Sequence, residues 1–127
     1  MSMNKRLWLK IIAVSGLLSV VLGAFAAHGL DAILTEQRMQ TFQTGVRYQL
    51  IHTLALLGLI CLPDELTQSY FKTYTGIFWL LGIVLFSGSL YLLVATDITA
   101  LGMITPLGGT AFIIGWALLF VAAIRNP

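Results

Sequence analysis

Long apolar stretches alternate with short polar ones along this chain. Four stretches are dominated by apolar residues, at positions 9–27, 46–62, 74–95 and 101–124. Each approaches the roughly 20 residues that an α-helix needs to cross a hydrocarbon core about 30 Å thick. Charged residues make up only 9% of the chain, whereas an ordinary soluble domain carries about a quarter. The pattern therefore predicts an integral membrane protein.

The predicted fold is an all-α, membrane-spanning four-helix bundle. The polar segment before the second apolar stretch extends that helix, because Met39, Phe42 and Val46 recur at helical spacing and Thr35 can cap its first turn. Little chain lies outside the helices, so we expect one domain over residues 1–127. The expected helices cover about residues 9–28, 36–62, 69–95 and 101–124.

The first apolar stretch also has features of a signal peptide. Basic residues precede it, and Ala24-Phe25-Ala26 has the small-residue pattern of a cleavage site. The apolar stretch is nevertheless longer than the roughly 7–15 residues of a signal-peptide core. We therefore expect this segment to be retained as a transmembrane helix.

Lysine and arginine positions predict the orientation in the membrane. The side that holds both termini and the second loop collects Lys5, Arg6, Lys10, Lys72 and Arg125, and the other side has Arg38 and Arg47. The positive-inside rule then places both termini in the cytoplasm. We also expect Trp8 to lie in the aromatic belt at that interface.

Small residues mark the surfaces where helices approach closely in lipid. The expected helix-packing residues are Ser15, Ser19, Gly23 and Ala27 in the first helix and Gly108 and Gly115 in the fourth. Trp116 lies about 13 Å from Arg125 along the helix, too deep for an interfacial belt. Its indole N–H should therefore find a partner inside the bundle.

Polar residues inside the membrane are the first candidates for function. On the second helix they share an arc of about 140°, with Arg47 turned away. His28 ends the first helix about 10 Å nearer the surface than His52, and the third helix offers hydroxyl partners. The candidate functional polar cluster is His28, Tyr48, Gln49, His52, Thr53, Ser87 and Tyr91.

Three kinds of chemistry fit this cluster. Two histidines on different helices are typical of b-type haem, but both must reach one iron. A proton relay or quinone pocket would use a neutral imidazole beside tyrosine and glutamine. The third interpretation is structural, with the side chains hydrogen-bonding helix to helix. A zinc site would need more ligands than two histidines and a distant Asp31, so we expect no bound metal. The sequence has no nucleophile–base or phosphate-binding pattern, so we also expect no catalytic residue.

Four motifs resemble one known family. They are residues 23–30, 48–52 and 86–91, and residues 105–109 leading to Gly115-Trp116. Together they resemble the YgdD/YwdK family of small bacterial inner-membrane proteins, which has an animal relative, over essentially the whole chain. One departure is Ala26, where the family often has glycine. The resemblance implies a four-helix protein of the bacterial inner membrane and no particular reaction; His28, Tyr48, Gln49 and His52 carry over as signature residues without roles.

The leading functional hypothesis is a non-enzymatic inner-membrane protein that acts as a structural, regulatory or partner subunit without a cofactor. The alternative is a protein that handles a small ligand, a quinone, a haem or protons at the His28/His52 face. Expected partners are membrane lipids together with a second copy or another membrane protein. Nucleic acid is not expected, because the basic residues are scattered singly at helix ends.

Overall fold

The computed structural model describes residues 3–125, and its regular structure over that range is helical throughout. Four continuous helical segments are long and apolar enough to cross a membrane, at Lys5–Leu30, Glu36–Cys61, Ser69–Thr96 and Thr99–Arg125. The predicted all-α architecture with four membrane-length helices is thereby confirmed.

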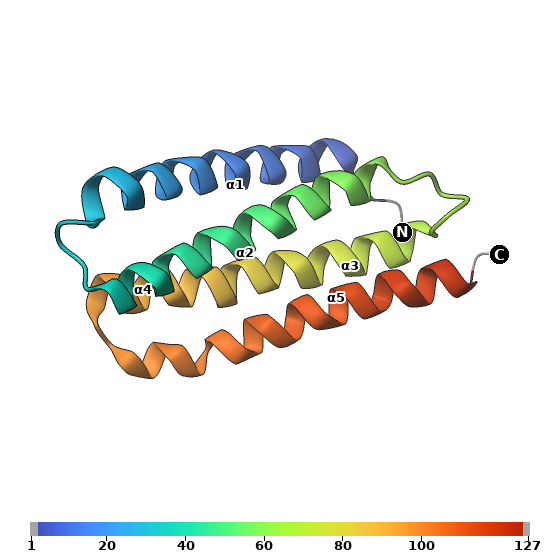
Figure 1. Ribbon diagram of the computed structural model, residues 1–127. Coiled ribbons are helices and arrows are strands. Elements are labelled where there is room, and N and C mark those ends of the chain that lie inside the picture. The colour runs from blue at the N-terminus through green and yellow to red at the C-terminus, as the bar shows by residue number, and fades with distance from the viewer. Residues whose placement is uncertain (1–2, 126–127) are drawn as a thin grey trace.

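Each of the four segments runs antiparallel to the segment that precedes it in the chain (Figure 1). Both described ends of the chain lie at the same end of the bundle as the loop between α2 and α3. The elements are α1 (Lys5–Phe25), the π-helical turn η1 (Ala26–Leu30), α2 (Glu36–Cys61), α3 (Ser69–Gly82), the π-helical turn η2 (Ile83–Ser87), α4 (Gly88–Thr96), the 3-10 helix η3 (Thr99–Met103) and α5 (Thr105–Arg125).

Side-chain caps fix where the first two long helices begin. The side chain of Asn4 accepts a hydrogen bond from the backbone N–H of Leu7 at 3.1 Å and so caps α1. Thr35 accepts from the N–H of Arg38 at 3.2 Å, which is the cap predicted for α2. Such caps satisfy N–H groups that lack a partner within the helix.

Glycines let the helices pack closely where α5 meets the third span. A Cβ atom added at Gly108 would lie 2.2 Å from the backbone nitrogen of Phe86, and one at Gly115 would lie 2.4 Å from Cδ1 of Trp79. Only glycine allows this spacing, because a Cβ atom at either position would overlap these atoms. Such close packing matters in lipid, where helices associate mainly through packing and hydrogen bonds.

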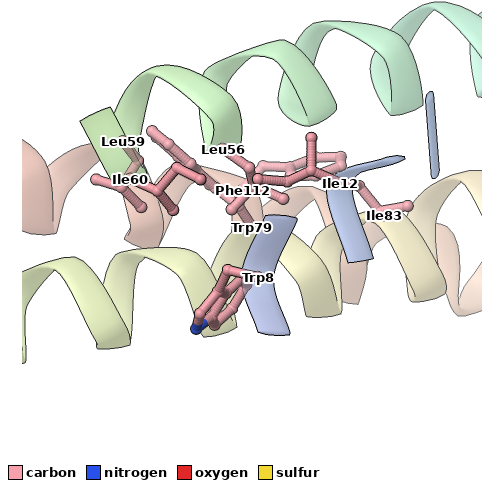
Figure 2. Packing of buried hydrophobic residues seen from close by; sticks show 8 residues of the cluster. All are labelled: Trp8, Ile12, Leu56, Leu59, Ile60, Trp79, Ile83 and Phe112. Atoms are coloured by element: carbon pink, nitrogen blue, oxygen red, sulfur yellow. The ribbon is translucent and has the colours of Figure 1, made fainter. Parts of the chain in front are cut away.

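The apolar core takes residues from all four membrane-length segments, whose side chains meet inside the bundle (Figure 2). Trp8 belongs to this core with only 8% of its surface exposed. Trp8 therefore packs inside the bundle, and its place in an interfacial belt, which concerns its depth in the membrane, stays a prediction. The reason for its burial is Gly76, because a Cβ atom there would lie 2.9 Å from Cη2 of Trp8, so the missing side chain leaves room for the indole. The core residues are Trp8, Ile12, Leu56, Leu59, Ile60, Trp79, Ile83 and Phe112.

Candidate functional site

The inward face of α2 carries the polar side chains of the candidate site. Gln49, His52 and Thr53 are buried, whereas Arg47 points outward and is exposed. Tyr48 lies at the edge of this face and keeps 39% of its surface exposed. This division follows from helical periodicity, which places residues three and four apart on one side of a helix.

Gln49 and Thr53 connect α2 to α1 through Ser15. The hydroxyl groups of Ser15 and Thr53 form a hydrogen bond with 2.7 Å between their oxygens. The Thr53 hydroxyl also donates to the carbonyl oxygen of Gln49 at 2.6 Å. The Gln49 amide nitrogen donates to the carbonyl and hydroxyl oxygens of Ser15 at 3.1 and 3.2 Å. Ser19, one turn along α1, donates to the same Ser15 carbonyl at 2.8 Å.

Two residues of the third span reach α2 from the opposite side. The hydroxyl of Tyr91 in α4 donates to the side-chain oxygen of Gln49 at 2.6 Å. The hydroxyl of Ser87 in η2 donates to the carbonyl oxygen of Gly45 at 2.7 Å. Gln49 therefore bonds to α1 through its nitrogen and to α4 through its oxygen, and it holds three helices together.

His52 connects α2 to α5. The indole nitrogen of Trp116 lies 3.0 Å from Nε2 of His52, and the other ring nitrogen, Nδ1, lies 2.9 Å from the carbonyl oxygen of Tyr48. An indole N–H can only donate, so Nε2 accepts and the proton sits on Nδ1, which donates to Tyr48. Phe112 stacks on the imidazole with ring centres 3.6 Å apart. His52 is thus a neutral histidine with both nitrogens bonded inside the protein.

The structure leaves two of the sequence-predicted residues outside these contacts. His28 lies in η1 and is exposed, and so is Ala27. In an α-helix a ridge of every fourth residue turns by about 40° at each step, and the π-helical turn at Ala26–Leu30 changes the helical rotation again before His28. Ala26, with 1% of its surface exposed, is buried in place of Ala27. The structure therefore leaves His28 outside the contacts of the cluster, and the expectation of Ala27 in the packing ridge is corrected to Ala26.

The remaining predicted packing residues lie at helix contacts. Ser15 and Ser19 are buried against α2. A Cβ atom at Gly23 would meet Val46 of α2 at 3.5 Å, an ordinary van der Waals distance. Gly108 and Gly115 are buried where α5 meets the third span, as described above.

A buried lysine is the feature that the sequence analysis missed. The sequence analysis counts Lys72 among the basic residues on the side of the second loop, and in the structure it lies in α3, within the expected helix, with only 1% of its side chain exposed. Its ammonium donates to the carbonyl oxygen of Leu62, at the end of α2, and to Asp64 at 2.7 Å. The hydrogen bond and the positive charge of Lys72 lower the pKa of Asp64. The available signal was an aspartate in a short loop, Asp64, followed eight residues later by a lysine in the first turn of the next helix.

A second ion pair closes the opposite end of the bundle. Arg38, in the first turn of α2, donates from Nη2 to Oδ1 of Asp97 at 2.7 Å and from Nε at 3.1 Å. Asp97 ends α4 in the left-handed conformation, with φ of 59°. Asp tolerates this conformation better than most residues, so the start of α2 is tied to the turn after α4.

The chemistry available at the cluster is that of a closed hydrogen-bond network. Over residues 3–125, His, Cys, Asp and Glu form no group of three or more that could hold a metal ion. The lone pair of His52 that could bind a metal or accept a proton already accepts the Trp116 N–H. The Tyr91 hydroxyl is similarly engaged with Gln49.

Comparisons with known proteins agree on one family. Residues 22–109 match the family model described as Protein of unknown function (DUF423). The UPF0382 membrane protein YwdK of Bacillus subtilis is 48% identical over 89% of this chain and 92% of its own length. The UPF0382 inner membrane protein YgdD of Escherichia coli is 43% identical over 97% of this chain and 93% of its own. A UPF0382 membrane protein of Haemophilus influenzae is 41% identical over 96% and 97%. No solved structure matches the chain.

Proposed function

Because the chain belongs to the DUF423 family of membrane proteins, whose description assigns no reaction, we propose a function from the geometry of the polar cluster. The protein is a non-enzymatic component of the bacterial inner membrane, a structural or regulatory partner subunit. Its buried polar cluster serves to fix the arrangement of the four helices. The resemblance noted in the sequence is confirmed by these relatives.

One observation carries the proposal, namely that the ring nitrogens of His52 are both bonded within the protein. A ligand site or proton path needs a polar atom that is free to exchange partners, and His52 would have to break its bond to Trp116 first. Gln49 is engaged in the same way on both its nitrogen and its oxygen. Polar groups in lipid that bond to neighbouring helices stabilise the bundle.

The alternative of a quinone-, haem- or proton-handling protein has weaker support. It rested on a shared His28/His52 face, and His28 is exposed in the turn that ends the first span. A haem held by two histidines needs both rings at one iron. The cluster therefore favours the structural role.

The proposal includes a topology and a domain organisation. We infer that residues 1–127 form a single domain with both termini in the cytoplasm. The end of the bundle that carries the termini also carries Lys5, Arg6, Lys10 and Arg125 besides the buried Lys72. Of the other basic residues, Arg38 lies in the first turn of α2, at the opposite end, and Arg47 lies nine residues further along this helix. The positive-inside rule compares the basic residues at the two ends.

The function is tested by separating ligand handling from folding. The protein and its His52→Gln variant are purified from membranes, their absorbance spectra recorded, and a short-chain quinone titrated into both. Glutamine keeps a donor and an acceptor, so we expect matching spectra without a haem Soret band, no saturable quinone binding, and similar resistance to unfolding by SDS. A Soret band or saturable quinone binding that disappears in His52→Gln, with folding unchanged, would contradict the structural role.

A further inference from the structure

A groove of about 380 Å³ runs between α1 and the third span and is open to the surroundings. α1 meets α3 where Trp8 covers Gly76, and the groove lies beyond this contact. Its walls are apolar, and its polar floor consists of Ser15 and Gln49, which already bond to each other. The apolar wall residues are Ile11, Val14, Leu18, Leu80 and Ile83.

One end of the groove is positively charged. Lys10 lines it directly, and Arg6 lies four residues earlier, on the same face of α1. Both side chains are exposed, and the ion pairs of the described chain are made by Arg38 and Lys72, not by these two residues. Arg6, Lys10, Val14 and Leu18 thus form one row along α1 that begins with two cations and continues with apolar side chains.

We infer that this groove binds one anionic phospholipid, with its phosphate on Lys10 and Arg6 and an acyl chain along Val14 and Leu18. The order of charge and apolar surface matches a lipid with a negative headgroup, and basic pockets between transmembrane helices are known to bind such headgroups. The volume is at the lower end of the roughly 300–1,000 Å³ of small-molecule sites.

The inference is independent of the proposed structural function, and it holds whichever membrane leaflet faces the charged end. It is tested first with the unaltered protein. Purified protein freed of lipid in detergent is titrated with phosphatidylglycerol, with phosphatidylcholine of the same acyl chains, and with inorganic phosphate, and the bound fraction is read by native mass spectrometry. We expect one phosphatidylglycerol per chain, at least tenfold weaker phosphatidylcholine binding, and no phosphate adduct. Equal binding of the two lipids, or binding of phosphate alone, overturns the inference.

Two pairs of variants then locate the site. Arg6→Gln with Lys10→Gln should bind phosphatidylglycerol roughly 30-fold more weakly, the loss expected for two cations at a membrane surface. The matched control, Arg47→Gln with Arg125→Gln, removes the same charge away from the groove and should bind like the unaltered protein. Wild-type affinity in the first variant, or an equal loss in both, overturns the inference.

The second pair probes the apolar part of the groove without changing any charge. Val14 lines the groove and is 57% exposed, whereas Val20 is 66% exposed and lies outside it. Val14→Trp should fill the space for the acyl chain and weaken phosphatidylglycerol binding at least fivefold relative to Val20→Trp. Circular dichroism of each variant checks that the helices are intact. Equal binding by the two tryptophan variants would place the lipid elsewhere.

Discussion

Trp116 and His52 form the hydrogen bond that joins α5 to α2, with 3.0 Å between the indole nitrogen and Nε2 of the imidazole. α5 packs mainly against α3 and η2, through Gly115 and Gly108. Among residues 3–125, α5 and α2 share no side-chain hydrogen bond other than that of Trp116 with His52. Trp116 itself is 45% exposed, so its outer ring faces the surroundings while its N–H points inward.

The first prediction concerns this bond. Trp116→Phe keeps an aromatic ring but leaves Nε2 of His52 without its donor, so we expect the free energy of unfolding to fall by about 1 kcal/mol, a typical value for a hydrogen bond between membrane helices. Unfolding in mixed micelles by SDS measures the change. His52→Leu should cost about the same, and the double variant should cost less than the sum, because one shared bond is lost. Additive losses would mean that the two side chains act independently.

The second prediction compares two helical glycines. Gly108→Ala places a methyl group 2.2 Å from the backbone nitrogen of Phe86, so α5 must move away from η2. Overpacking of this kind costs about 1–3 kcal/mol. Gly88→Ala is the control, because a Cβ atom there meets nothing within 4 Å. Alanine has a higher helix propensity than glycine, so the free energy of unfolding of this variant should be unchanged or slightly higher. Similar losses in the two variants would contradict close packing at Gly108.

The sequence predicts the spans and the inward face of α2 because both depend on local regularities. A membrane helix must be long and apolar, and helical periodicity alone places Gln49, His52 and Thr53 on one side. The depth of Trp116 in an apolar helix likewise implies a buried partner for its N–H. Which partner it meets depends on how α2 and α5 are placed relative to each other, and a single sequence does not encode that placement as a pattern.

The features that the sequence analysis misses have different physical origins. Trp8 resembles an interfacial residue until Gly76, on another helix, provides a space that its indole fills. Lys72 resembles a solvated cation until the end of α2 and Asp64 supply its partners. His28 is included in the predicted cluster as a polar signature residue at the outer end of the first helix, and in the structure it is exposed in the π-helical turn that ends this span. Only the contact of Trp8 with Gly76 joins residues far apart in the chain, because the partners of Lys72 lie eight and ten residues away from it.

The third prediction uses the ion pair between Asp64 and Lys72. Lys72 lowers the pKa of Asp64 through a hydrogen bond and its charge. A carboxyl group whose pKa is lower in the folded state stabilises the protein above the ordinary aspartate pKa of about 4, and this contribution is lost as the pH falls through the folded-state value. Asp64→Asn should therefore be less stable than the unaltered protein near pH 7, and the difference should shrink on acidification below about pH 4.

A neighbouring carboxylate supplies the control for this pH dependence. Glu65 is exposed and takes no part in the ion pairs of the described residues. Glu65→Gln should therefore match the unaltered protein at each pH when both are unfolded by SDS in mixed micelles. A difference between Asp64→Asn and the unaltered protein that stays constant down to about pH 3 would show that Asp64 acts through packing and not through its charge.

The last prediction tests the topology by cysteine labelling. Cys61 is exposed, so Cys61→Ser provides the background for single cysteines at Ala32, in the turn before α2, and at Glu65, in the loop before α3; both positions are exposed. With both termini in the cytoplasm, a membrane-impermeant maleimide added to intact cells should modify Ala32→Cys and leave Glu65→Cys unmodified. After the cells are opened, both should react, which controls for accessibility in the folded protein. Labelling of Glu65→Cys and protection of Ala32→Cys in intact cells would show the opposite orientation. Labelling of both variants in intact cells would show that the basic residues do not select one orientation.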